Sequence, residues 1–332
     1  VFDISLLDTR VTKTLDHNIA KEIVTLVKHI LKKLYDSIKT IWAEKPDRYY
    51  EIDGFRLDMG EGHMLSLIQK RCLMYDRFVP YLGKLADAKA RDSLAHEEPF
   101  WIIDIGANVG DTVAAFIRHT KAEILCVEPT KTFIELLEKN IYSMKPYSEQ
   151  VHIVNAYISN DETESYRSNV VHGTAIKQKV DGAFVQEAPT LTIPSLLKQQ
   201  NVVPEGIALV KIDTDGYDSE CILSFGYMLS EISPLLFWEN QIDTKSQLDQ
   251  FIRMINYMAG HGYEHFFVFD NFGNYLCCVD AYNMKNINRY LGRILYKHSP
   301  VSFYYVDVLA CKEGDKIMVE KTVEEYAAKF AY

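Results

Sequence analysis

The pattern of hydrophobic and polar residues changes at about residue 99. From there on, short apolar runs alternate with amphipathic stretches whose apolar residues recur every three or four positions. The runs predict strands buried on both faces, and the stretches between them predict helices that cover those faces. This alternation favours an α/β fold with a doubly wound, mostly parallel sheet. The predicted strands are 100–106, 123–129, 151–159, 207–216 and 234–240.

The chain after these strands departs from the alternation. Residues 265–279 contain two apolar runs around a turn at Asn271–Asn274, which predicts a hairpin. A helix over 281–297 and a last strand over 301–311 follow. We therefore expect one or more strands at this end of the sheet to run antiparallel.

The first 98 residues have a different pattern. Residues 18–42 repeat isoleucine and leucine at helical spacing with lysines between them, which predicts a long amphipathic helix. Alternation over 49–60, with Asp53-Gly54 near its start, predicts a β-hairpin. This N-terminal region would cap a pocket or, through the long helix, form a homodimer. The predicted division is a helical region over 1–98, a domain over 99–311 and a helical tail over 312–332.

Charge and composition make some partners and locations unlikely choices. The formal net charge is -10 and the pI is about 5.5, whereas duplex nucleic acid is usually bound by a basic domain. No apolar run approaches the roughly 18 to 20 residues that cross a bilayer. Residues 1–18 lack the basic start and apolar core of a secretory signal, and the cysteines show no C-x-x-C spacing. We expect a cytoplasmic protein without a nucleic-acid partner.

The turn after the first strand of the alternating region contains the most specific motif. In doubly wound sheets, ligands bind at the carboxyl ends of the strands, near the point where the strand order reverses. A dinucleotide loop would have a glycine at the position of Asn108, and Asp104 and Asp111 would repel a pyrophosphate. The ammonium and sulfonium of S-adenosylmethionine would be attracted instead. The turn reads Asp104-x-Gly106-x-Asn108-x-Gly110-Asp111-Thr112.

The second strand of this region ends in an acid that suits a nucleoside. Glu128-Pro129 stands at its tip, where a carboxylate can accept hydrogen bonds from both hydroxyls of a ribose. NAD and S-adenosylmethionine share that ribose, so the preceding loop has to distinguish them. It favours S-adenosylmethionine and leaves an NAD-linked oxidoreductase as the weaker alternative.

Several segments together resemble the FkbM family of S-adenosylmethionine-dependent methyltransferases. They are IDIGANVGDT, VEP, VKIDTDGYD and FWEN, and the resemblance covers about residues 99–311. Asp215 and Asp218 depart from the family, in which glutamates are usual at these positions. The resemblance implies a class I, Rossmann-like methyltransferase domain. It also implies that the cofactor is lined by Asp104, Gly106, Ala107, Asn108, Gly110, Asp111, Thr112, Glu128, Pro129, Asn155 and Ala156.

Methyl transfer to oxygen needs a group that removes the hydroxyl proton. Asp213 and Glu239 end the next two predicted strands, so their carboxylates would meet over one pocket. We predict that they are the catalytic pair and that burial or a neighbouring charge raises the pKa of one, which then acts as the base. By resemblance, Lys211 would pair with Asp213 or Glu239.

A metal-dependent alternative uses the same strand ends. Asp213 with the pair Glu239-Asn240 also resembles the catechol-type O-methyltransferases, which hold magnesium, and DTDGYDS resembles the metal-dependent macrocin O-methyltransferase family. A bound cation would lower the pKa of the acceptor hydroxyl. Because the FkbM resemblance implies no ion, S-adenosylmethionine is the predicted cofactor, and Mg²⁺ remains the alternative.

Residues 160–190 form a polar stretch that we expect to be irregular and to contribute to the acceptor site. His172 lies in it, and a solvated loop histidine is favoured over a catalytic base. The predicted function is O-methylation of a hydroxyl on a carbohydrate, either a polysaccharide or a sugar-containing natural product. A non-catalytic methyltransferase-fold module, which binds or assembles within a glycan-biosynthesis protein, is the competing prediction.

Overall fold

A computed structural model describes residues 45–93, 99–171, 173–180, 186–295 and 304–330. The chain divides into two compact units, residues 1–46 and 47–332, and the description below concerns the second. The helix predicted over 18–42 lies outside the described residues, and the homodimer predicted to form through it is therefore not tested. Residues 47–98 share their compact unit with the region of alternating strands and helices.

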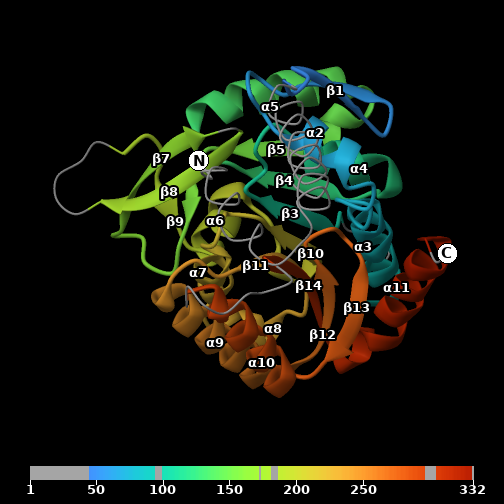
Figure 1. Ribbon diagram of the computed structural model, residues 1–332, viewed down its shortest axis with the longest axis vertical. Helices are drawn as coiled ribbons and strands as arrows, with labels where there is room; N and C mark the ends of the chain where they lie inside the picture. Colours follow the sequence, from blue (N-terminus) through green and yellow to red (C-terminus); the bar gives the residue numbers. More distant parts are fainter. Residues whose placement is uncertain (1–44, 94–98, 172, 181–185, 296–303, 331–332) are drawn as a thin grey trace, which may run out of the picture. The chain divides into compact units, whose positions relative to one another are not determined.

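An eight-stranded sheet forms the centre of this unit, in the order β13-β12-β14-β11-β10-β3-β4-β5 (Figure 1). The parallel part consists of β3 (Trp101–Ile105), β4 (Glu123–Val127), β5 (Val151–Val154), β10 (Ile207–Ile212) and β11 (Leu235–Gln241). The pairings within β12 (Tyr263–Asp270), β13 (Tyr275–Val279) and β14 (Tyr305–Lys312) are antiparallel, as is that of β14 with β11. The predicted α/β class, with its mixed sheet end, is confirmed.

Side chains of the strands alternate between two cores, one on each face of the sheet. Ile102 and Ile124 belong to the first core, whereas their neighbours Ile103 and Leu125 belong to the second. Alternation of this kind follows from the two-residue period of a strand. The first core is covered by α3 (Val79–Ser93), α4 (Asp111–Phe116), α5 (Lys131–Ser143) and α11 (Lys316–Phe330) (Figure 1). The second is covered by α6 (Ile193–Gln200), α7 (Asp218–Leu223), α8 (Met228–Glu231), α9 (Lys245–Gly260) and α10 (Ala281–Leu291).

The segment before the sheet begins with a hairpin of β1 (Tyr49–Ile52) and β2 (Phe55–Asp58). Its turn uses Asp53 and Gly54, both with positive φ (46° and 77°), as a two-residue turn of this hand requires. Asp58 fixes the hairpin to α5, because its carboxylate accepts from Lys139 at 2.6 Å and its N–H donates to the Asn140 side chain at 2.8 Å. The short helix α2 (Leu65–Arg71) follows and leads to α3.

The stretch predicted to be irregular between residues 160 and 190 is instead largely a second hairpin. It consists of β7 (Ser165–Val171) and β8 (Thr174–Val180), while β6 (Tyr157–Ile158) pairs with β9 (Thr190–Leu191) at its base. Lys177 fixes β8 in place, with its ammonium 3.8 Å from the centre of the Tyr166 ring and 3.3 Å from the Ile158 carbonyl oxygen. Because this buried residue is a lysine, the strand lacks the apolar alternation that would have predicted it. His172 lies outside the described residues.

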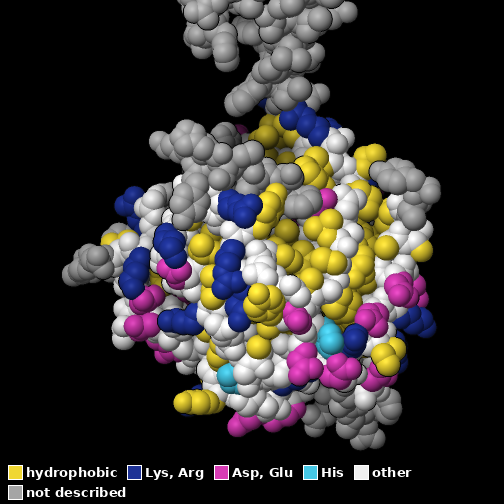
Figure 2. All heavy atoms as spheres, turned by 60° about the horizontal axis from the view of Figure 1, so that its bottom comes forward, with side chains coloured by type: hydrophobic (Ala, Val, Ile, Leu, Met, Phe, Trp, Pro, Cys, Tyr) yellow, Lys and Arg dark blue, Asp and Glu magenta, His cyan; other side chains and the backbone are white. Residues whose placement is uncertain are grey.

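On the face of the unit that Figure 2 shows, hydrophobic, basic and acidic side chains gather in different areas. Figure 2 shows hydrophobic side chains over the middle of the face in view, lysine and arginine to the left and acidic side chains towards the lower right. Within the described ranges, no helix is both long and apolar enough to cross a membrane.

Candidate functional site

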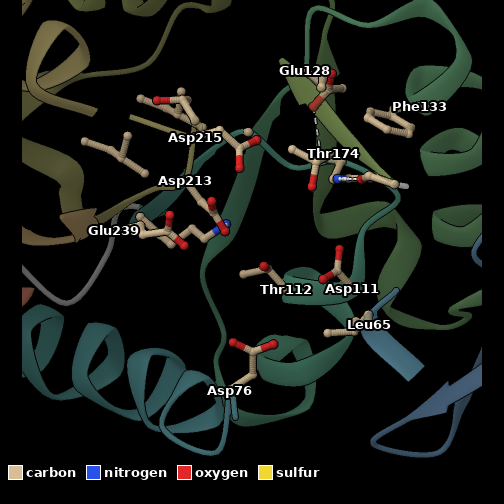
Figure 3. A pocket seen from close by; sticks show the side chains of 18 of the residues that line it. Leu65, Asp76, Asp111, Thr112, Glu128, Phe133, Thr174, Asp213, Asp215 and Glu239 are labelled. Atoms are coloured by element: carbon tan, nitrogen blue, oxygen red, sulfur yellow. Dashed lines mark hydrogen bonds and ion pairs between the residues drawn. The ribbon is translucent and has the colours of Figure 1, made fainter. Parts of the chain in front are cut away.

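A pocket opens at the carboxyl ends of β3, β4, β10 and β11 (Figure 3). The strand order reverses at β3, with β4 and β5 on one side and β10 and β11 on the other, so the pocket lies where ligands of such sheets bind. The segment between β2 and α2, the turn before α3, the β7–β8 hairpin and β14 complete its wall. Side chains far apart in the sequence thus face one cavity.

The loop between β3 and α4 has an unusual backbone. Gly106, Asn108 and Gly110 all have positive φ, at 82°, 48° and 87°, and asparagine is one of the few residues with a side chain that tolerates this region. A Cβ at Gly106 would lie 1.8 Å from the Asp213 carbonyl oxygen. Close approach of the loop after β10, rather than approach of a ligand, therefore requires glycine at position 106.

Glu128 is held against this loop. Its carboxylate accepts hydrogen bonds from the backbone N–H of Asn108 at 3.0 Å and of Thr130 at 2.8 Å, and only 3% of the residue is exposed. Burial raises the pKa of Glu128, while the bonds from Thr130 and Asn108 oppose that change. Because each carboxylate oxygen has two lone pairs, both oxygens can still accept a further bond from a ligand in the pocket. We call this region, from Gly106 to Glu128, the glycine-loop end.

An ion pair beneath the pocket joins the two central strands. Lys211 on β10 is in register with Asp104 on β3, and its ammonium lies 3.2 Å from the Asp104 carboxylate and 3.4 Å from that of Asp213. Burial alone would lower the pKa of Lys211, but the carboxylates of Asp104 and Asp213 raise it, so the side chain is cationic. Lys211 thus pairs with Asp213, as the family resemblance implies, and also with Asp104.

The structure brings most of the predicted site residues to the pocket. Those that line it are Gly106, Asn108, Asp111, Thr112, Glu128, Pro129, Ala156, Asp213 and Glu239. The remainder lie behind its wall. Asp104 is fully buried in its pair with Lys211, and Ala107 is packed in the core. Gly110 is the residue before α4, and Asn155 donates to the Glu128 and Pro129 carbonyl groups.

The opposite side of the pocket, which we call the acid end, consists of Asp76, Glu239 and Asp307. Glu239 on β11 stands directly opposite Asp307 on β14, and like charges in this position destabilise a sheet. Neither carboxylate has a hydrogen bond or ion pair with any described residue. Burial and the neighbouring Asp213 and Asp307 raise the pKa of Glu239 well above its usual range. Burial, Asp111 and Asp213 raise the pKa of Asp76 to about 7.

The set of magnesium ligands suggested by the catechol-type resemblance does not assemble. The Asn240 side chain is fully buried away from the pocket, where it accepts from the Trp238 indole N–H at 3.2 Å and donates to Asn288 at 2.9 Å. It points away because successive side chains of β11 alternate between the faces of the sheet. A different group comes together, since carboxylate oxygens of Asp213, Asp215 and Glu239 all lie within 4.8 Å of one another.

Asp76 and Asp307 are the residues of the acid end that sequence reasoning missed. Asp76 lies in the turn before α3 with φ 60°, inside the N-terminal region predicted to be helical apart from a hairpin, and no pattern marks it. Asp307 interrupts the apolar run YVDVLAC, and an acid within a buried strand is a signal that could have identified it. Tyr75 and Tyr305, whose hydroxyls are 3.5 Å apart, also line the pocket.

Comparison with protein families matches residues 104–265 to the methyltransferase FkbM domain. This match confirms the resemblance found in the sequence, and it contains the glycine-loop end, Asp213 and Glu239. Asp76 and Asp307 lie on either side of the matched region. No curated protein matches the chain.

Solved structures that resemble the chain include several methyltransferases. An O-methyltransferase from Bacillus cereus in complex with SAH is 12% identical, with a TM-score of 0.39 over 75% of this chain and 89% of that one. Cofactor-bound Rv0187 from MTB is 11% identical, with a TM-score of 0.40 over 74% and 86%. Precorrin-6y C5,15-methyltransferase from Geobacter metallireducens GS-15 is 10% identical, with a TM-score of 0.30 over 68% and 86%. Sequence identities and TM-scores this low do not support a conclusion about the reaction of this protein.

Proposed function

We propose that the protein is an S-adenosylmethionine-dependent O-methyltransferase that acts on a carbohydrate hydroxyl, because residues 104–265 match the methyltransferase FkbM domain. One observation carries this proposal. Glu128 and Glu239 line different walls of the same pocket (Figure 3). The Glu128 carboxylate can accept hydrogen bonds from a ribose, and the Glu239 carboxylate can accept a proton. A nucleoside cofactor held by the first would share a cavity with an acceptor that faces the second.

The residues of the glycine-loop end fit this cofactor. Glu128 has free lone pairs for ribose hydroxyls, and the carboxylates of Asp111 and Asp213 line the pocket where they would attract an ammonium or sulfonium. The Oδ1 atom of Asn108 is buried and has no hydrogen-bond partner in the described part of the chain. A buried acceptor without a partner is costly, and a donor group of the ligand would satisfy it.

The bound cofactor would supply a methyl group made electrophilic by its sulfonium. Glu239 would accept the proton that the acceptor hydroxyl releases as its oxygen bonds to the methyl carbon and the bond from that carbon to sulfur breaks, which leaves S-adenosylhomocysteine. A carboxylate whose pKa is raised is a stronger base than an ordinary carboxylate, and Glu239 has that property because it is half-buried beside Asp213 and Asp307. Asp213 itself is paired with Lys211, so we assign it to cofactor or acceptor orientation rather than to proton removal.

The acid end suits an acceptor with several hydroxyl groups. The carboxylates of Asp76 and Asp307 accept hydrogen bonds but cannot donate them when ionised, whereas the hydroxyls of Tyr75 and Tyr305 can do both. A sugar presents several hydroxyl groups at once, and each can donate to an ionised carboxylate or accept from a protonated one. An acceptor with an amino group would also be attracted, and the acceptor series below distinguishes the two.

We propose that the transfer does not depend on a resident metal. Asp213, Asp215 and Glu239 have suitable oxygens, but the Lys211 ammonium is 3.4 Å from Asp213 and already supplies positive charge there. A divalent ion beside it would be repelled. Activity of the wild type should therefore be the same after treatment with EDTA as after addition of Mg²⁺. Loss of activity with EDTA and recovery with Mg²⁺ would establish the metal-dependent alternative.

The test of the function is an acceptor series with S-adenosylmethionine. The wild type is incubated with neutral monosaccharides, oligosaccharides, amino sugars and simple amines, and S-adenosylhomocysteine is measured with the mass of the product. We expect turnover with a neutral sugar and addition of one methyl group to oxygen. Turnover with amines alone would show that the acceptor is an amine rather than a carbohydrate hydroxyl. Binding of the cofactor without turnover, despite intact folding, would favour the non-catalytic module.

A further inference from the structure

His63 is a buried polar side chain of the pocket that the proposed function leaves without a role. It lies between β2 and α2, outside the region that matches the family, and it lines the cavity. Only 8% of the residue is exposed, and its Nε2 atom has no hydrogen-bond partner among the described residues. Polar atoms that are buried without a partner are rare in folded proteins, so Nε2 is a candidate for contact with a ligand.

The other ring nitrogen determines what Nε2 can do. The backbone N–H of Leu65 donates to Nδ1 of His63 at 3.4 Å, so Nδ1 presents its lone pair. A neutral imidazole has one proton, and we therefore assign it to Nε2. The free atom is consequently a hydrogen-bond donor, and it requires an acceptor atom.

Contacts of His63 place it at the glycine-loop end. Its ring packs against Gly173 in the turn between β7 and β8, where φ is +90° and a Cβ would lie 2.6 Å from the ring atoms Cγ and Cδ2. The Gly173 carbonyl accepts from the Asn108 side chain at 2.9 Å, and the Asn108 backbone N–H donates to Glu128. His63 is thus linked through Gly173 to the loop assigned to the cofactor, rather than to Glu239.

The two residues that contact Gly173 each have a buried polar atom without a partner in the described part of the chain. His63 offers a donor at Nε2, and Asn108 offers an acceptor at Oδ1. S-adenosylmethionine has both complements in its amino-acid part, as carboxylate and ammonium, and in its adenosine part, as ring nitrogens or ribose oxygens and the amino group. Water would satisfy the same atoms, but a ligand in this pocket would displace it.

We propose that His63 is a cofactor-positioning residue, which donates its Nε2–H to an acceptor atom of S-adenosylmethionine. The inference rests on the proposed function and extends it to a residue before the matched domain. It gives the N-terminal segment a part in the site, because this segment supplies the donor and the β7–β8 hairpin supplies the glycine on which the ring rests.

Isothermal titration of S-adenosylhomocysteine into the full chain tests the proposal. His63→Leu removes the donor at similar volume, and His63→Gln restores an N–H donor near the position of Nε2. Loss of one hydrogen bond to a ligand should weaken binding by roughly 10-fold, and by up to about 100-fold if the acceptor is the carboxylate. His261→Leu is the matched control, since this histidine bonds to the Tyr257 carbonyl at 2.7 Å and does not line the pocket.

A second ligand identifies the acceptor atom. 5′-Methylthioadenosine lacks the amino-acid part, so a His63→Leu defect seen with S-adenosylhomocysteine alone would indicate the carboxylate. An equal defect with both ligands would indicate the adenosine part, and either pattern supports the proposal. In turnover, the variant should show a raised KM for S-adenosylmethionine with little change in kcat.

Other outcomes overturn the proposal. Wild-type affinity in His63→Leu would remove His63 from the cofactor site and leave the proposed function intact. A loss that His63→Gln does not restore would indicate packing rather than donation. Failure of the wild type to bind S-adenosylhomocysteine would overturn the proposed function together with this inference.

Discussion

The carboxylates at the glycine-loop end and at the acid end of the pocket differ in their hydrogen-bond partners. At the glycine-loop end, Glu128 accepts backbone hydrogen bonds from Asn108 and Thr130. At the acid end, Glu239 and Asp307 face each other across two strands, and no described residue pairs with either carboxylate. Backbone donors therefore stabilise the Glu128 carboxylate, whereas Glu239 and Asp307 repel each other until a ligand or a proton joins them.

This difference favours cofactor binding at the glycine-loop end and removal of the acceptor proton at the acid end. A carboxylate fixed by backbone donors keeps one position and can recognise the same cofactor in every turnover. Carboxylates that repel one another have raised pKa values and can accept a proton or a hydroxyl donor, which is what removal of an acceptor proton requires. Variants at the two ends should therefore have separable effects, and the predictions below run from the largest effect to the smallest.

Glu239→Gln should produce the largest loss of activity. Removal of the base should lower kcat/KM by roughly 10²- to 10⁴-fold, because general-base catalysis contributes on that scale. Affinity for S-adenosylhomocysteine should change by less than about twofold, since the contact that would be lost is not with the cofactor. Glu205→Gln, at an exposed carboxylate, is the control and should match the wild type. Full activity of Glu239→Gln would remove the base from this mechanism.

Lys211→Met should destabilise both ends at once. It leaves Asp104 fully buried without its cation, and breaking a buried ion pair in this way typically costs about 3–5 kcal/mol. Urea unfolding measures the loss, and the double variant Asp104→Asn with Lys211→Met should recover part of it. If the single variant has wild-type stability, the ion pair does not hold β3 and β10 together as we describe.

Variants at Glu128 and at Asp307 test whether the glycine-loop end and the acid end act independently. Glu128→Ala should weaken S-adenosylhomocysteine by roughly 10- to 100-fold, because a ribose contact and the support of Asn108 are lost together. Asp307→Asn should leave that affinity unchanged and raise the KM for the acceptor by roughly 5- to 10-fold, the effect of one weakened hydrogen bond. Weakened cofactor binding in both variants would show that the two ends are not independent.

Stability should fall as the pH rises. Burial and acidic neighbours raise the pKa to about 7 for Asp76 and Asp218 and to about 8 for Asp215. Between the ordinary carboxyl pKa and these values, the folded protein holds more protons than the unfolded chain, so its unfolding free energy decreases with pH. The Tm without ligand should therefore be lower at pH 8 than at pH 6, by a few degrees as a rough scale. A Tm that rises over this interval would contradict the assignment.

The glycine-loop end could be predicted from sequence because its residues are close together along the chain. Gly106, Asn108 and Glu128 belong to two consecutive strand-to-turn units, and strand geometry alone brings such turns to one edge of the sheet. The same reasoning placed Asp213 and Glu239 at that edge. It could not show that Asp104 points under the pocket to Lys211, because that depends on the register between β3 and β10.

The acid end could not be predicted in the same way. Asp76 and Asp307 come from segments more than two hundred residues apart, and they meet only through the packing of the turn before α3 against β14. The β7–β8 hairpin was missed because Lys177 and its aromatic neighbours replace the usual apolar face. His63 gave no signal, because its proposed role depends on contact with Gly173, which is more than a hundred residues away in the sequence.

Thermal unfolding of the wild type with S-adenosylhomocysteine or with NAD tests the central claim most directly. The loop around Asn108, with the carboxylates of Asp111 and Asp213 lining the pocket, should accept the first ligand and reject the pyrophosphate of the second. At about 100 times its Kd, a ligand adds roughly 2.7 kcal/mol, which should raise the Tm of a chain of this length by about 4 °C. We predict that rise with S-adenosylhomocysteine and no change with NAD. A rise with NAD alone would contradict the assignment of this pocket to methyl transfer.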